Sequence, residues 1–353
     1  MQKICSIVGA RPQFVKACPL SIQLRKSFRE ILIHTGQHYD TNMSGIFFNE
    51  MQIPKPDYNL NIGSGSHGKQ TGAMISEIEE VLLYEKPDFV IVYGDTNSTL
   101  AGALAAAKLH IPVAHVEAGL RSFNNKMPEE INRILTDRLS SWLFVPSEKS
   151  VENLNNEGIH KNIFVVGDIM FDAILMFKEL ASKRKNHTEE DLTIKKYFLA
   201  TIHRAENTDN EKNLKEIFDS LSLIDGEIII PLHPRTNEKI KEYGITPSKN
   251  IKVINPVGYL DMIKLMENAK IILTDSGGIQ KEAYYLNVPC ITLRNETEWV
   301  ETVQSGWNIL TGIDRVKINK AVEKINEVKK LNHTPFYGDG RTAEKIAGIL
   351  MNN

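Results

Sequence analysis

A chain of 353 residues is longer than one hydrophobic core usually organises, so we expect two domains. Its 42 Lys and Arg residues nearly cancel its 44 Asp and Glu residues, and the net charge of −2 excludes a surface built to coat nucleic acid. Any anion-binding site must therefore be local.

Membrane and metal partners are not expected either. No uninterrupted apolar run approaches the roughly eighteen residues that span a bilayer, and the N-terminus turns polar too early for a secretory signal. We therefore expect a cytoplasmic protein. Its three cysteines are too few and too scattered for a disulfide framework or a CxxC metal site, and Cys5 and Cys290 lie in apolar runs typical of buried strands.

Short apolar runs alternate with longer amphipathic runs in the first half of the chain. The expected strands are 3–9, 30–34, 88–94, 112–117, 142–147 and 163–167. Helical patterns between them include 68–86 and 99–110. Strands separated by helices of this length favour a parallel sheet covered on both faces.

The same rhythm restarts after a polar, charge-rich stretch at 178–196, which we interpret as a linker plus a surface helix. The expected strands of this half are 197–203, 226–233, 251–257, 269–276 and 288–294. The layout predicts an α/β protein with two doubly wound parallel-sheet domains of similar size. Ligands of such sheets bind beyond the carboxyl ends of the strands, so a shared ligand would lie in the cleft between the domains.

Polar residues stand where the strands of the first half end. The segment GARPQFVK (9–16) brings Arg11 and Lys16 to a helix N-terminus, which favours an anion, although a plain turn with exposed bases is the alternative. Asp95 directly follows a buried strand, where Asp is also a common helix cap. Glu117 ends the next strand, and Glu is rarely buried without a purpose. Two acids at neighbouring strand ends would face the same crevice.

Two further acids, Glu129 and Glu130, follow Pro128 and lie close in sequence to Arg121 and Arg133. Acids suit the first turn of a helix, and this accounts for one of them without any chemistry. The alternatives are a solvated, charge-balanced loop or a site where protons move beside a bound anion.

Bases gather at two strand ends in the second half, His203 with Arg204 and His233 with Arg235. One strand-end His is commonly a packing residue, whereas two His-Arg pairs at successive strand ends suit a phosphate-rich ligand. No metal-ligand spacing is recognisable, so we predict no catalytic metal.

The segment DSGGIQKEA (275–283) places a Ser-Gly-Gly turn between a strand and a helix. Glycine lets backbone N–H groups approach a phosphate, and the helix N-terminus favours its charge. Glu282, one turn into that helix, is placed to accept hydrogen bonds from ribose hydroxyls. These residues indicate an enzyme of nucleotide-sugar chemistry, with a nucleotide diphosphate held by the second domain and carboxylates supplied by the first.

Eight motifs in this order resemble those of the non-hydrolysing UDP-N-acetylglucosamine 2-epimerases. They are GARPQFVK, HTGQHYD, GDTNST, HVEAGLRS, MPEEINR, TIHRAEN, HPRT and DSGGIQKEA. The resemblance covers nearly the whole chain and implies the two-domain GT-B fold, a homodimer and no cofactor. It also implies that 1–167 with 340–353 form the domain with the catalytic acids, and that 168–339 form the UDP-binding domain.

The resemblance implies interconversion of UDP-GlcNAc and UDP-ManNAc for surface polysaccharide precursors. The C2 proton is removed and UDP is expelled to leave 2-acetamidoglucal, and UDP adds back after protonation on the opposite face. Such a reaction asks for more than one acid–base group. By position these groups would be Asp95, Glu117 and Glu129, and His203 would assist the departure of UDP.

The resemblance also implies a set of substrate-binding residues. Gln37 and His38 match a pair near the sugar, and Glu282 would bind the ribose. The diphosphate would be surrounded by Arg11, Lys16, His233, Arg235, Ser276, Gly277 and Gly278. The remaining substrate contacts would be Arg121, Arg133, Arg204 and Tyr259.

Two departures from the family pattern bear on regulation and on the sugar. Members activated by a second UDP-GlcNAc tend to carry QHRxM where this chain has QHYDTNM (37–43), so this activation does not carry over. Many members read TERPE where this chain has TEWVE (297–301), which resembles enzymes acting on UDP-2,3-diacetamido-2,3-dideoxy-glucuronic acid; alternatively Trp299 packs between the domains.

We expect UDP-GlcNAc as the substrate and keep that uronic acid nucleotide as the alternative. A hydrolysing epimerase, a GT-B glycosyltransferase and a nucleotide-sugar sensor without activity are the other interpretations. The last two leave the three acids of the first domain without a purpose.

Overall fold

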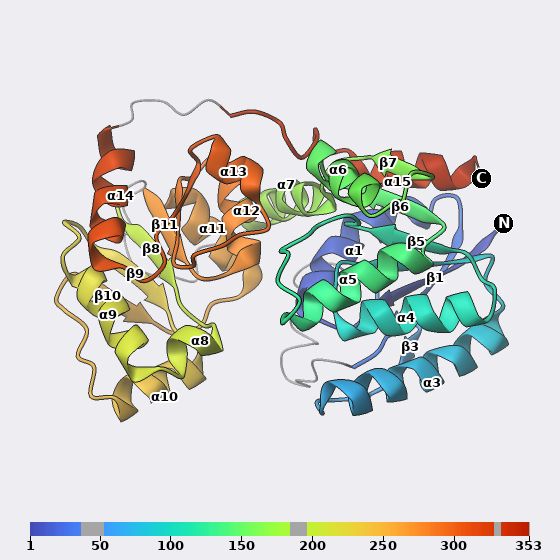
Figure 1. Cartoon of the computed structure of the whole chain (residues 1–353), viewed down its shortest axis with the longest axis horizontal. Helices are drawn as coiled ribbons and strands as arrows, with labels where there is room; N and C mark the ends of the chain where they lie inside the picture. Colours follow the sequence, from blue (N-terminus) through green and yellow to red (C-terminus); the bar gives the residue numbers. More distant parts are fainter. Residues whose placement is uncertain (37–52, 184–195, 328–332, 353) are drawn as a thin grey trace. The chain divides into compact units, whose positions relative to one another are not determined.

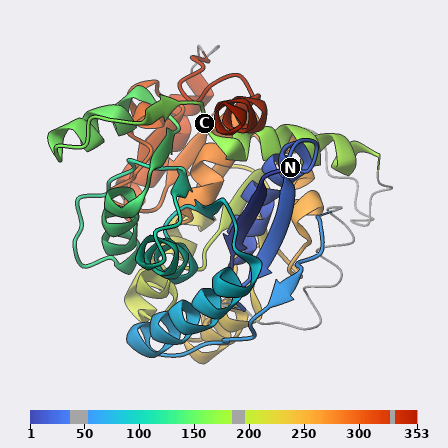
Figure 2. The same ribbon diagram turned by 90° about the vertical axis from the view of Figure 1, so that its right-hand side faces the viewer.

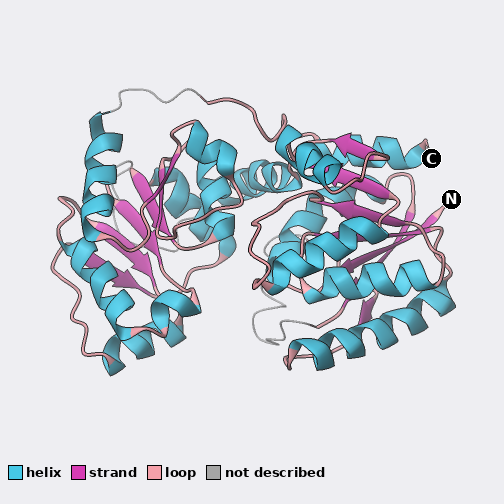
Figure 3. Ribbon diagram, viewed as in Figure 1, coloured by secondary structure: helices cyan, strands magenta, loops and turns pink. Residues whose placement is uncertain are grey.

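The computed structural model describes residues 1–36, 53–183, 196–327 and 333–352 (Figure 1). The chain divides into two compact units, Met1–Met176 with Pro335–Asn353, and Phe177–Thr334. Each unit consists of a parallel sheet with helices packed around it (Figure 3). The predicted fold class, two doubly wound parallel-sheet units of the GT-B type, is therefore confirmed.

Among the described residues, the sheet of the first unit has seven parallel strands in the order β3-β2-β1-β4-β5-β6-β7. These are β1 (Lys3–Val8), β2 (Arg29–His34), β3 (Tyr58–Asn59), β4 (Phe89–Tyr93), β5 (Val113–Val116), β6 (Trp142–Val145) and β7 (Ile163–Val165). The six strands predicted in this half all form. The additional strand, β3, has two residues, which is too short to produce a periodic pattern.

The described helices of this unit cover both faces of its sheet. They are α1 (Arg11–Leu24), α3 (His67–Glu85), α4 (Asn97–Lys108), α5 (Pro128–Leu139), α6 (Glu148–Asn156), the beginning of α7 (Ile169–Ser182) and α15 (Thr342–Met351). Apolar residues of α3 and α4 pack against β1 and β4 in one hydrophobic core. The C-terminal helix α15 returns to pack against α1 (Figure 2). Its first turn is held by Asp172, whose carboxylate accepts hydrogen bonds from the N–H groups of Thr342 (3.1 Å) and Ala343 (2.8 Å).

The described part of the second unit contains a six-stranded parallel sheet in the order β10-β9-β8-β11-β12-β13. Its strands are β8 (Phe198–Thr201), β9 (Ile228–Pro231), β10 (Ile251–Ile254), β11 (Ile271–Thr274), β12 (Cys290–Thr292) and β13 (Asn308–Leu310). Its helices are α8 (Ala205–Thr208), α9 (Glu211–Ser222), α10 (Pro234–Glu242), α11 (Tyr259–Asn268), α12 (Gly277–Tyr285), α13 (Val300–Gln304) and α14 (Arg315–Glu327). The five predicted strands form, and β13 is the one that the apolar pattern missed.

The predicted linker at 178–196 needs correction at its start. Residues 178–182 are the last turn of α7, a helix that begins at Ile169 and buries Phe177 completely. Its apolar beginning was not recognised, because a helix that is apolar on most sides lacks the amphipathic pattern that marks a surface helix. Residues 184–195 lie outside the described residues.

The cysteines behave as small buried hydrophobes, as predicted for Cys5 and Cys290. All three thiols are free and buried. Burial raises the pKa of Cys5, Cys18 and Cys290 to about 12, so these thiols stay protonated at neutral pH. Across the described ranges, no helix is long and apolar enough to cross a membrane.

Candidate active site

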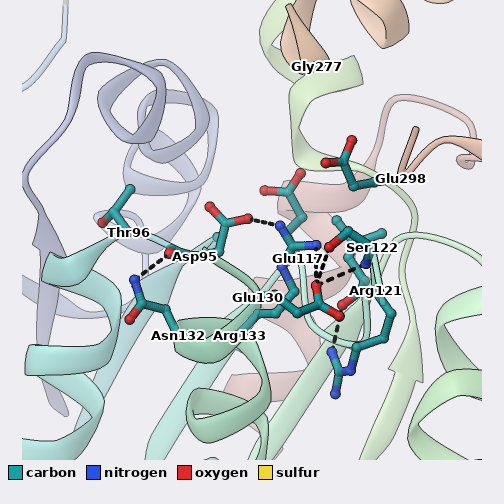
Figure 4. A network of polar contacts seen from close by, with 12 residues as sticks. Asp95, Thr96, Glu117, Arg121, Ser122, Glu130, Asn132, Arg133, Gly277 and Glu298 are labelled. Carbon is teal, nitrogen blue, oxygen red and sulfur yellow. Dashed lines mark hydrogen bonds and ion pairs between the residues drawn. The ribbon is translucent and has the colours of Figure 1, made fainter. Parts of the chain in front are cut away.

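Two acids follow neighbouring strands at the carboxyl edge of the first sheet. The parallel strands β4 and β5 pair with Tyr93 opposite Val116, so Asp95 and Glu117 both emerge at the same edge (Figure 4). The Glu117 residue is 7% exposed, whereas the Asp95 side chain is 31% exposed. The structure thus brings together the two acids that the strand pattern placed at this edge.

The backbone at Glu117 is strained. Its φ of 73° lies in the left-handed region, which costs a residue with a Cβ on the order of 1–3 kcal/mol. The N–H groups of Glu117 and Ala118 both donate to the carbonyl of Phe144, at 3.1 and 3.0 Å, so the two residues that follow β5 face one residue of β6. This bend directs the carboxylate to Lys16 of α1, with which it forms an ion pair. A Cβ at Gly94 would lie 3.3 Å from Glu117 Oε2, so glycine leaves room beside this pair.

Asp95 is held by α5. Arg133 contacts the Asp95 carboxylate through Nη2, and the Asn132 side-chain amide donates to the main-chain carbonyl of Asp95 at 2.9 Å (Figure 4). Arg133 is 4% exposed and also lies 3.2 Å from Oε2 of Glu130. Each of the two edge acids therefore stands next to one base.

The two glutamates in the first turn of α5 occupy different environments. Glu130 is 1% exposed, and its carboxylate accepts hydrogen bonds from Ser122 N–H, Ser122 O–H and Phe123 N–H, each at 2.9 Å. Glu129 is exposed. Glu130 therefore holds the loop before α5 in place through these hydrogen bonds. The structural role that the sequence analysis offered for one of the two acids fits Glu130. Glu129 is the member of the pair that a ligand can reach.

Arg121, predicted to contact substrate, lies among carboxylates of its own unit. Its side chain is 1% exposed and contacts Glu157 through Nε (2.6 Å) and Nη2 (2.9 Å), and Asp137 through Nη1 (2.8 Å). Burial by itself lowers the pKa of Arg121, but its bonds to Glu157 and Asp137 outweigh that and raise the pKa above its usual value. This geometry favours a role in joining the loop after β5 to α5 and the end of α6.

A buried histidine that the sequence analysis did not single out supports the same edge. His115 is completely buried in β5, with Nδ1 2.7 Å from Asp137 and Nε2 2.7 Å from the main-chain carbonyl of Gly94. It therefore fixes the turn that precedes Asp95. The signal available in the sequence was a polar residue in the middle of an apolar strand, two positions before Glu117.

In the second unit, one buried carboxylate organises the base-rich strand ends. Asp275 follows β11, is completely buried, and accepts hydrogen bonds from the N–H groups of His203 (3.2 Å) and Arg204 (3.1 Å) and from the Asn207 amide (3.0 Å). Its Oδ1 also lies 3.4 Å from Nδ1 of His203, whose side chain is 52% exposed. No role was predicted for Asp275, although an acid directly after a buried strand is the signal that singled out Asp95.

Of the other bases of this edge, His233 and Arg235 are exposed and Arg204 is partly exposed. His233 caps α10, and its Nδ1 accepts from the Arg235 N–H at 3.4 Å. The Arg235 guanidinium contacts Asp209, and Arg204 lies 3.8 Å from Glu206. His203 and Arg204 therefore stand over the buried Asp275, while Arg204 and Arg235 also lie beside exposed carboxylates. In the first unit, the predicted phosphate ligand Arg11 is exposed as the first residue of α1.

The Ser-Gly-Gly turn forms the N-terminus of α12. Ser276 is the N-cap, and its hydroxyl accepts from the N–H of Ile279 at 3.5 Å. A Cβ at Gly277 or Gly278 would meet no side-chain atom nearer than 3.7 or 3.9 Å, respectively. Packing within the chain therefore does not require glycine at either position. The missing side chains leave the first N–H groups of the helix approachable from outside.

Two predicted ligands of the nucleotide contact each other. The Tyr259 hydroxyl, at the start of α11, donates to Oε1 of Glu282 at 3.0 Å, and Glu282 is 6% exposed. Gln37 and His38, predicted to lie near the sugar, are outside the described residues.

Comparison with known proteins identifies the family around this geometry. Residues 21–351 match the family described as UDP-N-acetylglucosamine 2-epimerase. The chain is 56% identical over 356 residues to a UDP-N-acetylglucosamine 2-epimerase homolog of Methanococcus maripaludis, with 99% of each chain covered. It is 48% identical over 356 residues to the UDP-2,3-diacetamido-2,3-dideoxy-D-glucuronate 2-epimerase of Pseudomonas aeruginosa, again with 99% of each covered. A solved structure of Methanocaldococcus jannaschii UDP-GlcNAc 2-epimerase in complex with UDP-GlcNAc and UDP is similar with a TM-score of 0.91 and 50% identity, covering 99% of this chain and 100% of that one.

Proposed function

The chain belongs to the UDP-N-acetylglucosamine 2-epimerase family, and we propose that it interconverts UDP-GlcNAc and UDP-ManNAc by inverting C2. The observation that carries this proposal is the acid cluster of the first unit. Asp95 and Glu117 emerge at one sheet edge, each next to a base, and the exposed Glu129 begins the helix that holds Asp95. A proton that leaves one face of C2 and returns to the other requires more than one acid–base group.

The reaction proceeds by elimination and addition. A base takes the proton from C2 while the bond between C1 and the β-phosphate oxygen breaks, which yields 2-acetamidoglucal and UDP. An acid then protonates C2 from the opposite face, and the same phosphate oxygen bonds to C1 again. Atoms and electrons balance without an oxidant or reductant. The groups that the reaction needs from the protein at C2 are therefore a base and an acid. In this proposal Asp95, Glu117 and Glu129 transfer the protons.

The second unit stabilises the departing UDP. Negative charge develops on the β-phosphate as the C1–O bond breaks, and preorganised positive groups there lower the barrier. His203 is supported from below by Asp275, which fixes its backbone and lies near its Nδ1, leaving the rest of the ring exposed toward a ligand. The Gly277–Gly278 turn offers backbone N–H groups to the phosphates, and Glu282 with Tyr259 receives the ribose hydroxyls. The similarity to a structure that contains UDP-GlcNAc and UDP supports a UDP-sugar as the ligand.

Proton NMR of the protein with UDP-GlcNAc in heavy water tests this function. We expect UDP-ManNAc to appear and deuterium to enter C2 of both nucleotide sugars, because each passage through the glucal takes its new proton from solvent. Release of free ManNAc would instead mean a hydrolysing epimerase. An unchanged spectrum would reject UDP-GlcNAc as the substrate.

A second candidate substrate is UDP-2,3-diacetamido-2,3-dideoxy-glucuronic acid. It is favoured by the 48% identity to the P. aeruginosa 2-epimerase and by Trp299-Val300 in place of Arg-Pro. The test is a direct comparison of kcat/KM for the two nucleotide sugars under the same conditions. A higher kcat/KM for the uronic acid nucleotide would make it the preferred substrate, and the proposed epimerisation at C2 would still hold.

Assembly and location stay predictions that rest on the family resemblance. We propose a homodimer, which light scattering would detect as twice the chain mass. Cytoplasmic location is tested by cell fractionation.

A further inference from the structure

Trp299 packs against the first turn of α12. The residue is 6% exposed, and its indole Nε1–H donates to the main-chain carbonyl of Gly277 at 2.9 Å. The ammonium of Lys281, one turn along α12, lies 4.2 Å from the centroid of the ring. All three residues belong to the second unit, so Trp299 has a defined role inside one unit.

The carbonyl that Trp299 binds belongs to the peptide between Gly277 and Gly278. In a planar trans peptide, the C=O and N–H point in opposite directions, so a partner that fixes the carbonyl also fixes the N–H of Gly278. That N–H is one of the first in α12, where helical N–H groups have no acceptor within the helix. Glycine at both flanking positions gives this peptide more freedom than other residues would, and the indole adds a restraint to the helical hydrogen bond that the same carbonyl accepts.

We propose that Trp299 is a positioning residue that orients the Gly277–Gly278 peptide so that the Gly278 N–H binds a phosphate of the nucleotide diphosphate. The inference rests on the proposed function, whose UDP site it deepens. Two effects act in the same direction. The indole holds the N–H at the required angle before the ligand arrives, and a carbonyl that accepts a hydrogen bond makes the N–H of its own peptide a stronger donor. The Lys281 ammonium also lies at this turn, and the carboxylate of Glu298 beside Gly277 is paired with Arg294.

The indole signal of Trp299 provides the first test. The chain has three tryptophans, so uniformly ¹⁵N-labelled protein gives three indole N–H signals, and Trp299→Phe identifies the one from Trp299. Titration with UDP should shift this signal, whereas titration with uridine should leave it in place, because only UDP reaches the peptide that the indole holds. A Trp299 signal that moves equally with both ligands, or with neither while UDP binds, would overturn the inference.

Affinity measurements with a matched control provide the second test. Trp299→Phe keeps an aromatic ring but removes the donor, and we expect UDP affinity to fall about five-fold, as for one lost hydrogen bond, with uridine affinity unchanged. Trp307→Phe is the control, because Trp307 is also 6% exposed in the same unit but packs on Tyr284 and His333. It should change neither affinity.

The outcomes separate this inference from the proposed function. Wild-type epimerisation together with unchanged UDP affinity in Trp299→Phe would reject the positioning role alone. Wild-type protein that binds no UDP would reject both. If Trp299→Phe does not fold, replacing the indole of residue 299 by benzothiophene, which keeps the shape and lacks the N–H, makes the same comparison.

Discussion

The carboxyl edges of the two sheets have the same architecture and opposite chemistry. The first edge presents Asp95 and Glu117 after β4 and β5, with each carboxylate next to a base from a helix. The second edge presents the exposed His203 and His233 after β8 and β9, and His203 contacts the buried carboxylate of Asp275. Doubly wound sheets collect functional residues at strand ends, but the residue types there decide the chemistry.

The two edges also differ in the contacts that hold their charged residues. Acids at the first edge are restrained by direct ion pairs to side chains, so their charge is partly neutralised before a ligand arrives. At the second edge, Asp275 holds His203 and Arg204 through their backbone N–H groups, and the side-chain ion pairs of Arg204 and Arg235 are made with exposed carboxylates. The first arrangement suits proton transfer, and the second suits binding of an anion.

The largest effect is expected at the first edge. Glu117→Gln keeps the shape of the side chain but removes its ability to exchange a proton, so we expect kcat to fall by about 10³-fold or more. Deuterium entry at C2 should fall in parallel, and UDP affinity should change little because the second edge is intact. Glu77→Gln, at an exposed position of α3, is the control and should behave as wild type. Full activity in Glu117→Gln would remove this acid from the mechanism.

The two neighbouring acids of α5 are expected to differ: one substitution should lower activity and the other should lower stability. Glu129→Gln should lower kcat about 10²-fold without changing Tm, because Glu129 is exposed. Glu130→Gln should lower the free energy of unfolding by about 2 kcal/mol, because the buried carboxylate accepts three hydrogen bonds from Ser122 and Phe123. Activity assays and thermal unfolding of the two variants measure both effects. The reverse pattern would assign the chemistry to Glu130.

This pair shows what a sequence can predict and where it stops. Both glutamates were predicted in the first turn of a helix, and α5 begins at Pro128 as expected. Successive helical residues differ by about 100° in direction, so the two glutamates could not share one environment. Which of them is buried depends on the loop at 122–123, whose position follows from the packing of distant segments and not from local pattern.

Strands were predictable because apolar runs bounded by turns are a local signal, and all eleven predicted strands form. In the described part of the chain, the two strands that were missed, β3 and β13, have two and three residues. Partners that come from distant parts of the chain were not predictable. Arg121 binds Asp137 and Glu157, and Asp275 holds residues about seventy positions earlier, so their structural roles became visible only in the folded chain.

The variant Asp275→Asn tests whether activity depends on the buried carboxylate at the second edge. Asp275→Asn removes the negative charge under His203 and Arg204 and turns one acceptor into a donor. We expect kcat to fall about 10- to 100-fold, as for a misplaced catalytic group, with a change in the pH dependence of kcat that a purely structural role would not produce. A variant that loses stability but keeps the wild-type pH profile would make Asp275 a structural residue only. Asp209→Asn, which removes the exposed partner of Arg235, is the matched control and should have a smaller effect.

The smallest effect is expected for Gly278→Ala at the start of α12, where stability and UDP affinity should change in opposite directions. Gly278→Ala should raise the free energy of unfolding by up to about 1 kcal/mol, because Ala is the better helix former and its Cβ meets no atom nearer than 3.9 Å. The same methyl group lies where a phosphate would approach the Gly278 N–H, so UDP affinity should fall about ten-fold while Tm rises. Gly72→Ala in α3, where a Cβ would meet nothing within 4 Å, should give the same stabilisation without loss of affinity. Opposite signs for stability and affinity in one variant cannot arise from general damage to the fold. An unchanged UDP affinity would therefore show that the first turn of α12 is not where the diphosphate binds, and that the second edge holds its anion through side chains alone.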